Sequence, residues 1–128
     1  MDSIPSPFTI EIDGKPIVKV SDGAEDRTHA KTGTDAAVFT LKDSRLQSDE
    51  WILARSLAED RSLLPKKVLW FKADSDAAVH AVTASQEGDS YRLKFADAGL
   101  MATDGEVYAD LLGGELYPSR MVVYTDLL

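Results

Sequence analysis

The chain has no cysteine among its 128 residues. Disulfide bonds, thiolate catalysis and cysteine-ligated zinc or iron–sulfur sites are therefore excluded together. It also has no apolar run near the ~20 residues that a membrane helix needs, so no membrane partner is expected. The first residues have neither a basic start nor an apolar stretch, so they do not indicate a signal peptide. We expect a chain that is cytoplasmic as synthesised.

Positive charge is scarce. The 14 lysine and arginine residues stand against 22 aspartate and glutamate residues, giving a formal net charge of −8. Such a surface repels phosphate backbones, so nucleic acid is not an expected partner. Hydrophobic residues make up 44% of the chain and are spread along its length, which suits one folded domain.

Alternation of apolar and polar residues predicts strands over most of the chain. Phe8–Ile12 and Tyr91–Phe95 alternate most cleanly, and Val68–Phe71 is a continuous apolar run typical of a strand covered on both faces. Asp13-Gly14 and Asp104-Gly105 are hairpin turn signals. Further strands are expected at residues 16–20, 36–42, 77–84, 107–112 and 121–124. The pattern predicts a mainly β fold, an Ig-like β-sandwich or a small barrel.

One segment has helical spacing. Ser48 is a good N-cap, the acidic pair Asp49-Glu50 suits a first helical turn, and leucines recur up to Leu64. Pro65 then provides a stop. This predicts one short helix around residues 48–64, with a strand over residues 50–57 as the alternative.

The first seven residues contain two prolines, which keep them extended. We expect an N-terminal arm of residues 1–7 before a single β-sandwich domain of residues 8–128. The prolines would reduce the entropy lost when the arm lies on a partner, and tyrosines and an apolar chain end also suit an interface. The predicted partner-binding residues are Pro5, Pro7, Phe8, Tyr117, Tyr124, Leu127 and Leu128.

Few residues offer chemistry. His29 lies with Asp26 in a polar loop of residues 21–35, where a histidine with carboxylates can bind a metal or activate water, but the spacing matches no ligand pattern. Asp74-Ser75-Asp76 offers oxygens to calcium without EF-hand spacing, and turn chemistry explains it equally well. There is no Gly-x-Ser-x-Gly elbow. We expect no catalytic residue and no cofactor, while ion binding by the loop stays open.

Three motifs resemble a known family: Gly33–Leu41 as a turn into an apolar strand, Leu64–Lys72 as a second strand entry, and Tyr91–Phe95 as a Tyr-x-Phe-like strand. Together the stretch Gly33–Tyr124 resembles the N-terminal Ig-like domain of upper-baseplate proteins in tailed bacteriophages. The insertion at residues 44–64 departs from that pattern. The resemblance implies a virion component without catalytic residues.

The first hypothesis is therefore a non-enzymatic structural or adaptor protein of a phage tail or baseplate, which binds other proteins as a homo-oligomer or in a larger assembly. The alternative is a small acidic inhibitor or immunity-type protein that binds a basic protein target. A second alternative is a carbohydrate-binding module, or an enzyme, that uses the loops around His29 and Asp104.

Overall fold

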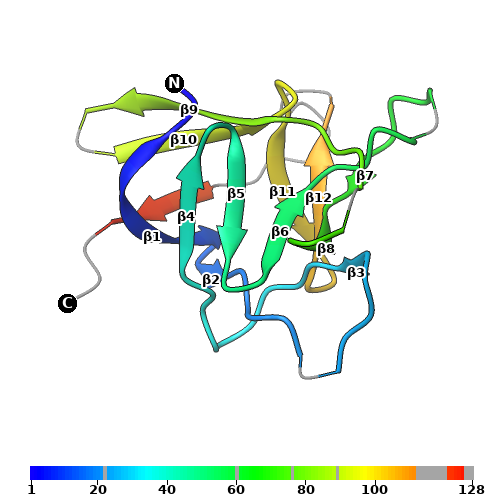
Figure 1. Cartoon of the computed structure of the whole chain (residues 1–128). Coiled ribbons are helices and arrows are strands. Elements are labelled where there is room, and N and C mark those ends of the chain that lie inside the picture. Colours follow the sequence, from blue (N-terminus) through cyan, green and yellow to red (C-terminus); the bar gives the residue numbers. More distant parts are fainter. Residues whose placement is uncertain (22, 60, 76, 89, 112–120, 126–128) are drawn as a thin grey trace.

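The computed structural model describes residues 1–21, 23–59, 61–75, 77–88, 90–111 and 121–125, and all regular structure in them is β (Figure 1). This confirms the mainly β prediction. The strands in these ranges are β1 (Ile4–Ile12), β2 (Lys15–Pro16), β3 (Thr28–His29), β4 (Phe39–Lys42), β5 (Arg45–Ser48), β6 (Trp51–Ala54), β7 (Lys66–Lys67), β8 (Leu69–Lys72), β9 (Val82–Glu87), β10 (Ser90–Phe95), β11 (Gly99–Thr103), β12 (Glu106–Asp110) and β13 (Met121–Tyr124). No helix in these ranges is long and apolar enough to cross a membrane.

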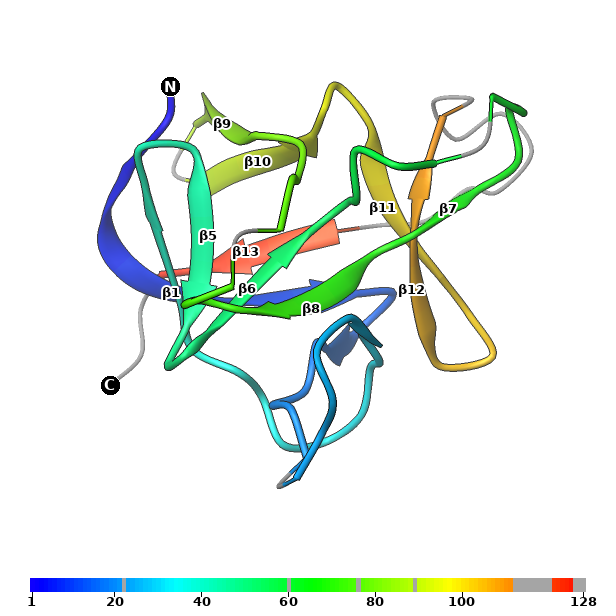
Figure 2. The same ribbon diagram turned by 45° about the vertical axis from the view of Figure 1, so that its right-hand side comes forward.

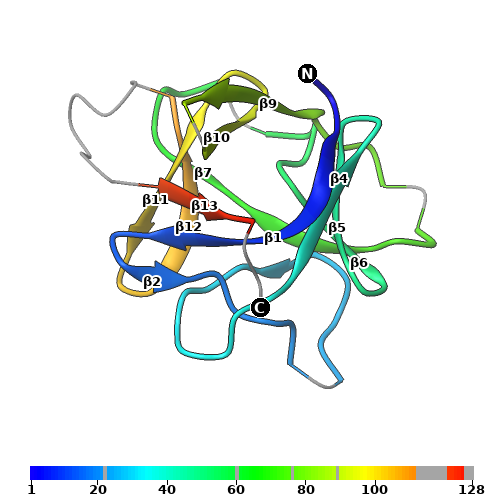
Figure 3. The ribbon, with the colours of Figure 1, turned by 90° about the vertical axis from the view of Figure 1, so that its left-hand side faces the viewer.

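The strands form three antiparallel sheets. The largest has the order β13-β1-β4-β5-β6-β8-β3, with β2 pairing to β1. A β9–β10 hairpin and a three-stranded sheet of order β11-β12-β7 complete the fold. Within the described ranges none of these sheets closes on itself. Figure 3 shows β1 between β13 and β4, so segments from both ends of the chain lie side by side.

The core lies between the sheets and is filled by alternate side chains of the strands. Phe8, Ile10 and Ile12 of β1 are all fully or almost fully buried, as the alternation predicts. Phe8 stacks on Phe39 with ring centroids 6.1 Å apart, and Phe39 stacks on Trp70 at 5.6 Å. This row of three rings connects β1, β4 and β8 through the centre of the molecule.

In the described part of the chain, four two-residue turns have positive φ at both central residues, the backbone that suits the right-handed twist of a hairpin. Two of them, Asp13-Gly14 and Asp104-Gly105, carry the predicted signal. The other two, Asp43-Ser44 and Ala96-Asp97, place non-glycine residues in the left-handed region. Hairpin geometry at these two sites therefore comes from strand pairing and not from turn composition.

The predicted helix around residues 48–64 is wrong. Residues 51–54 instead form β6, which lies within the alternative strand of residues 50–57. The described residues 55–59 and 61–65 form a loop. Ile52, Leu53 and Ala54 are all buried, because β6 is covered on both faces. A strand covered in this way shows no alternation, and its apolar residues can match a helical spacing by chance.

Residues 1–7 lie against the body of the domain. β1 begins at Ile4, whose side chain is buried. The amino group of Met1 donates to the Ala84 carbonyl at 2.8 Å, and the Ser44 amide donates to the Asp2 carbonyl at 2.8 Å. The backbone of the first residues is thus hydrogen-bonded to other segments of the domain, and the side chains of Pro5 and Pro7 are exposed.

The polar segment between β2 and β4 forms a lobe below the sheets (Figure 2). Its backbone is tied to the core strands, because the Arg27 amide donates to the Trp70 carbonyl and the Ala30 amide donates to the Val68 carbonyl. Asp26 accepts a further bond from the Lys72 amide at 2.8 Å. The predicted long polar loop is present, but much of its backbone is engaged.

Candidate functional site

Between β6 and β7 the chain leaves the sheet as a loop, and we call its described residues, 55–59 and 61–65, the anchored loop. It projects from the body of the molecule beside β7 (Figure 1). Leu57, Leu63 and Leu64 on this loop are 54%, 65% and 64% exposed. They are three of the six large hydrophobic side chains exposed in the described ranges. Apolar side chains gathered on one exposed segment mark interaction surfaces.

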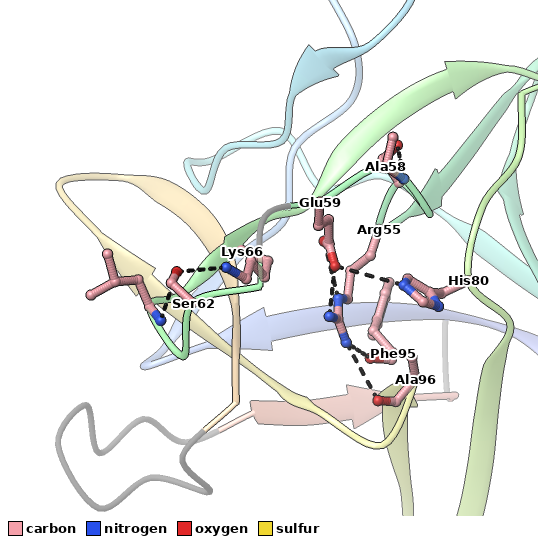
Figure 4. Close-up of polar contacts among 10 residues, drawn as sticks. Arg55, Ala58, Glu59, Ser62, Lys66, His80, Phe95 and Ala96 are labelled. Atoms are coloured by element: carbon pink, nitrogen blue, oxygen red, sulfur yellow. Dashed lines mark hydrogen bonds and ion pairs between the residues drawn. The ribbon is translucent and has the colours of Figure 1, made fainter.

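The first anchor of the loop is an ion pair between Arg55 and Glu59 (Figure 4). The Arg55 Nη2 atom lies 2.7 Å from Glu59 Oε1, and its Nε atom lies 3.2 Å from Glu59 Oε2. Both side chains are largely shielded, at 7% and 14% exposure. A two-point contact between a guanidinium and a carboxylate fixes the distance and the angle between its partners.

The same guanidinium connects the anchored loop to the turn after β10. Arg55 Nη1 donates to the Phe95 carbonyl at 2.8 Å and to the Ala96 carbonyl at 3.4 Å. These residues are 40 and 41 positions further along the chain. Arg55 therefore holds the start of the loop against a different hairpin, as Figure 4 shows.

The outgoing arm of the anchored loop also pairs with residues 78–80. The Leu57 amide donates to the Ala78 carbonyl at 3.1 Å, and the His80 amide donates to the Arg55 carbonyl at 2.9 Å. The His80 Nε2 atom lies 3.6 Å from Glu59 Oε1. Glu59 is thus flanked by a guanidinium and an imidazole, which keep its carboxylate in place.

The returning arm has its own anchor. The Lys66 Nζ atom donates to Ser62 Oγ at 2.9 Å, and the Leu64 amide donates to the same oxygen at 3.4 Å. Lys66 is buried, and its strand β7 pairs with β12. Because both arms are held, the exposed leucines lie between two fixed points, with the Arg61 side chain also outward.

A hollow of ≈ 270 Å³ opens near the base of the loop, between β6 and residues 77–82. Ile52, Ala54, Phe71 and Val79 supply much of its apolar wall. Among the described lining residues Phe71 is the single phenylalanine, tyrosine or tryptophan, and it is buried at 1% exposure. An exposed ring of these three types is therefore missing from the described lining, and the hollow gives no support to the carbohydrate-binding alternative.

His29 serves a structural contact. Its Nε2 atom lies 2.7 Å from the Val107 carbonyl oxygen and its Nδ1 atom lies 2.9 Å from Glu106 Oε2. Its ring also meets the Tyr108 ring edge-on at 4.9 Å. These contacts join β3 to β12, whereas Asp26 is engaged with the Lys72 amide. The structure does not bring His29 and Asp26 together as a site.

The Asp74-Ser75-Asp76 segment, whose oxygens could suit calcium, is an ordinary turn where it is described. The Ser75 amide and hydroxyl both donate to the Lys72 carbonyl, at 3.0 and 2.8 Å, and Asp104-Gly105 forms the hairpin turn between β11 and β12. Asp76 lies outside the described residues. In the described ranges no group of three acidic or histidine side chains is placed to hold a metal ion.

The predicted partner-binding residues are scattered. Pro5 and Pro7 are exposed on β1, and Tyr124 is 45% exposed on β13. Phe8 is fully buried in the aromatic row, so its side chain offers no surface. Tyr117, Leu127 and Leu128 lie outside the described residues. Partner contact through the exposed members of this set stays a prediction.

Sequence reasoning did not find the anchored loop. Arg55 and Glu59 are four residues apart, a spacing that also suits an ion pair on a helix, so the pair does not distinguish the loop from the predicted helix. The useful signal was the run Leu63-Leu64-Pro65, in which apolar residues directly precede a proline between two polar segments.

A comparison with protein-family models gives a match to the family Peptidase inhibitor I66 over residues 33–124. No curated protein and no solved structure matches the chain. The matched region begins after β3 and ends with β13, so it includes the anchored loop together with residues 78–80 and the β10–β11 turn, which its outgoing arm contacts.

Proposed function

The chain belongs to the peptidase inhibitor I66 family, and we propose that it binds a peptidase and lowers its activity. The match over residues 33–124 is the observation that carries this proposal, because it covers most of the sheet that positions the exposed surfaces. Membership of an inhibitor family also confirms that the chain is not an enzyme and that its partners are proteins.

The phage hypothesis is wrong. The resemblance to upper-baseplate Ig-like domains covered Gly33–Tyr124, the same stretch that the inhibitor family matches. Its motifs were alternating strands and glycine or aspartate turns, which occur in many β folds. A virion tail or baseplate role is thereby overturned, and the family gives no support to a homo-oligomer or larger assembly.

The inhibitor alternative is the one that the family match favours. A net charge of −8 would speed association with a basic peptidase, which is why we keep a basic target within the proposal. The ionisable pairs Arg55–Glu59 and His29–Glu106 form structural contacts. This suits a protein that blocks a peptidase by covering it and not by a chemical reaction. Inhibition then requires only a surface complementary to the peptidase.

The direct test is to titrate the full chain against one serine, one cysteine, one aspartic and one metallo-peptidase. Initial rates are measured with a small peptide substrate, and the chain is checked afterwards for cleavage. We expect a concentration-dependent fall in rate for at least one class, with the chain intact. Undiminished rates for all four classes at a large excess of the chain would refute the proposed function.

A further inference from the structure

We propose that the anchored loop enters the substrate cleft of the target peptidase, with Leu63 and Leu64 filling apolar substrate pockets. This inference rests on the proposed inhibitory function and adds the element that performs it. The shape of the loop and its apolar side chains both match such a cleft. The loop projects, and substrate sites are concave and lined mainly by apolar groups.

The second support is the distribution of exposed apolar side chains. Leu57, Leu63 and Leu64 share one loop, whereas Val38, Tyr124 and Met1 are the exposed large hydrophobics elsewhere in the described ranges. The other long projecting segment, residues 21–35, contains no large apolar residue. A few clustered apolar anchors supply most of the binding energy of a typical interface. The anchored loop is the described segment that offers such a cluster.

The third support is preorganisation. The outgoing arm is fixed by Arg55, through its contacts to Glu59 and to the carbonyls of Phe95 and Ala96. The returning arm is fixed by the bond from Lys66 to Ser62. A loop held at both ends loses less conformational entropy on binding than a free one, and so more of its contact energy becomes affinity.

The anchored loop contacts the peptidase cleft through its apolar side chains and not through its cationic one. Arg61 is exposed on the same loop and could instead enter a pocket that carries a carboxylate. Three leucines against one arginine favour the apolar reading, since a solvated guanidinium must lose water to enter the cleft whereas exposed leucines gain by leaving water. The two readings predict opposite results for the same set of variants.

The experiment uses the full chain and a peptidase that the wild type inhibits. Leu63→Ala, Leu64→Ala and the double variant are compared with Arg61→Ala and with Val38→Ala, the matched control at an exposed apolar residue outside the loop. We expect the double variant to raise the inhibition constant at least about tenfold, and Arg61→Ala and Val38→Ala to stay within about threefold. Melting temperatures should be unchanged, because all these side chains are exposed.

A second measurement tests entry into the cleft. Binding of the wild-type chain is compared between the free peptidase and the same peptidase with its active site blocked covalently by a small inhibitor. We expect the blocked enzyme to bind at least about tenfold more weakly. Equal binding, wild-type inhibition by the double variant, or loss of inhibition in Arg61→Ala alone overturns the inference and leaves the proposed function intact. Failure of the wild type to inhibit any peptidase overturns both.

Discussion

The Arg55 guanidinium holds both carboxylate oxygens of Glu59, at 2.7 and 3.2 Å, across only four residues of non-helical chain. This contact bends the outgoing arm of the anchored loop back on itself. Because the same guanidinium also reaches two carbonyls of the β10–β11 turn, loop shape and hairpin position depend on each other. Substitutions at this pair should therefore affect both stability and inhibition.

Glu59→Gln should destabilise the protein by about 1–3 kcal/mol, because the shielded guanidinium loses its charged partner while keeping its carbonyl contacts. Chemical denaturation measures this change, with Glu25→Gln, an exposed carboxylate in the polar lobe, as the control. Inhibition should weaken in parallel because the loop loses its fixed shape. Equal stability of Glu59→Gln and the control would show that the pair does not hold the loop.

Arg55→Lys keeps the charge and should still cost about 2 kcal/mol, because an ammonium group cannot reproduce the planar fork that contacts Glu59, Phe95 and Ala96 together. Arg45→Lys is the matched control, since Arg45 donates a single exposed bond to the Ala73 carbonyl. The midpoints of thermal unfolding compare the two. A loss in Arg45→Lys as large as in Arg55→Lys would contradict the role of the fork.

Gly33→Ala should destabilise by about 1–2 kcal/mol, because a Cβ atom there would lie 2.9 Å from Val18 Cγ1 and the stiff valine has little freedom to move. Gly99→Ala is the control, since a Cβ at Gly99 meets nothing within 4 Å and its φ is not positive. That variant should be neutral or gain a few tenths of a kcal/mol. The two variants are compared by their denaturant midpoints, provided that the slope of unfolding free energy against denaturant concentration is the same for both.

The double change Ala96→Asn with Asp97→Gly should stabilise by about 0.5–1 kcal/mol, since φ is 52° at Ala96 and 66° at Asp97 and Asn-Gly accepts this turn with less strain. Asp104→Asn, in a turn that already ends in glycine, should change stability little. Thermal unfolding gives the measurement. A lower midpoint for the double variant would mean that the side chains of Ala96 and Asp97 make contributions beyond the turn backbone.

His29→Ala should lower stability by about 1–3 kcal/mol, because its ring ties β3 to β12. Inhibition should be unchanged, because the His29 ring contacts Glu106, Val107 and Tyr108 and not the side chains of the anchored loop. Glu106→Gln should cost less, since the bond to the Val107 carbonyl remains. Zinc or calcium added to the wild type should leave the melting temperature unchanged. Stabilisation by either ion, lost in His29→Ala, would restore the metal-site hypothesis.

Much of the fold follows from local sequence patterns. β10 and β13 occupy the predicted positions, and the Asp-Gly turns at residues 13–14 and 104–105 form as their composition indicates. β10 is predictable because one face of the strand is buried and its sequence alternates with a two-residue period. β6 departs from this rule, since it is covered on both faces and carries no period to read.

The candidate site depended on contacts that no local pattern contains. Arg55 meets Phe95 across 40 residues, and Lys66 is buried although lysines are usually exposed. Leu57 and Leu64, which lie within the predicted helix of residues 48–64, are instead exposed on a loop. Only the tertiary contacts show that this segment is a loop whose two arms are fixed by Arg55 and Lys66.

The position of β1 between β13 and β4 has a consequence for how the protein is made. Thr9–Ile12 pair with residues 121–124, so β1 lacks this neighbour until those residues, more than 100 positions later, have left the ribosome. Folding should then be slow and late, as for other chains dominated by distant strand pairs. Until that moment the unpaired edge of β1 can recruit strands from other molecules, and production at low temperature or low synthesis rate should increase the yield of soluble protein.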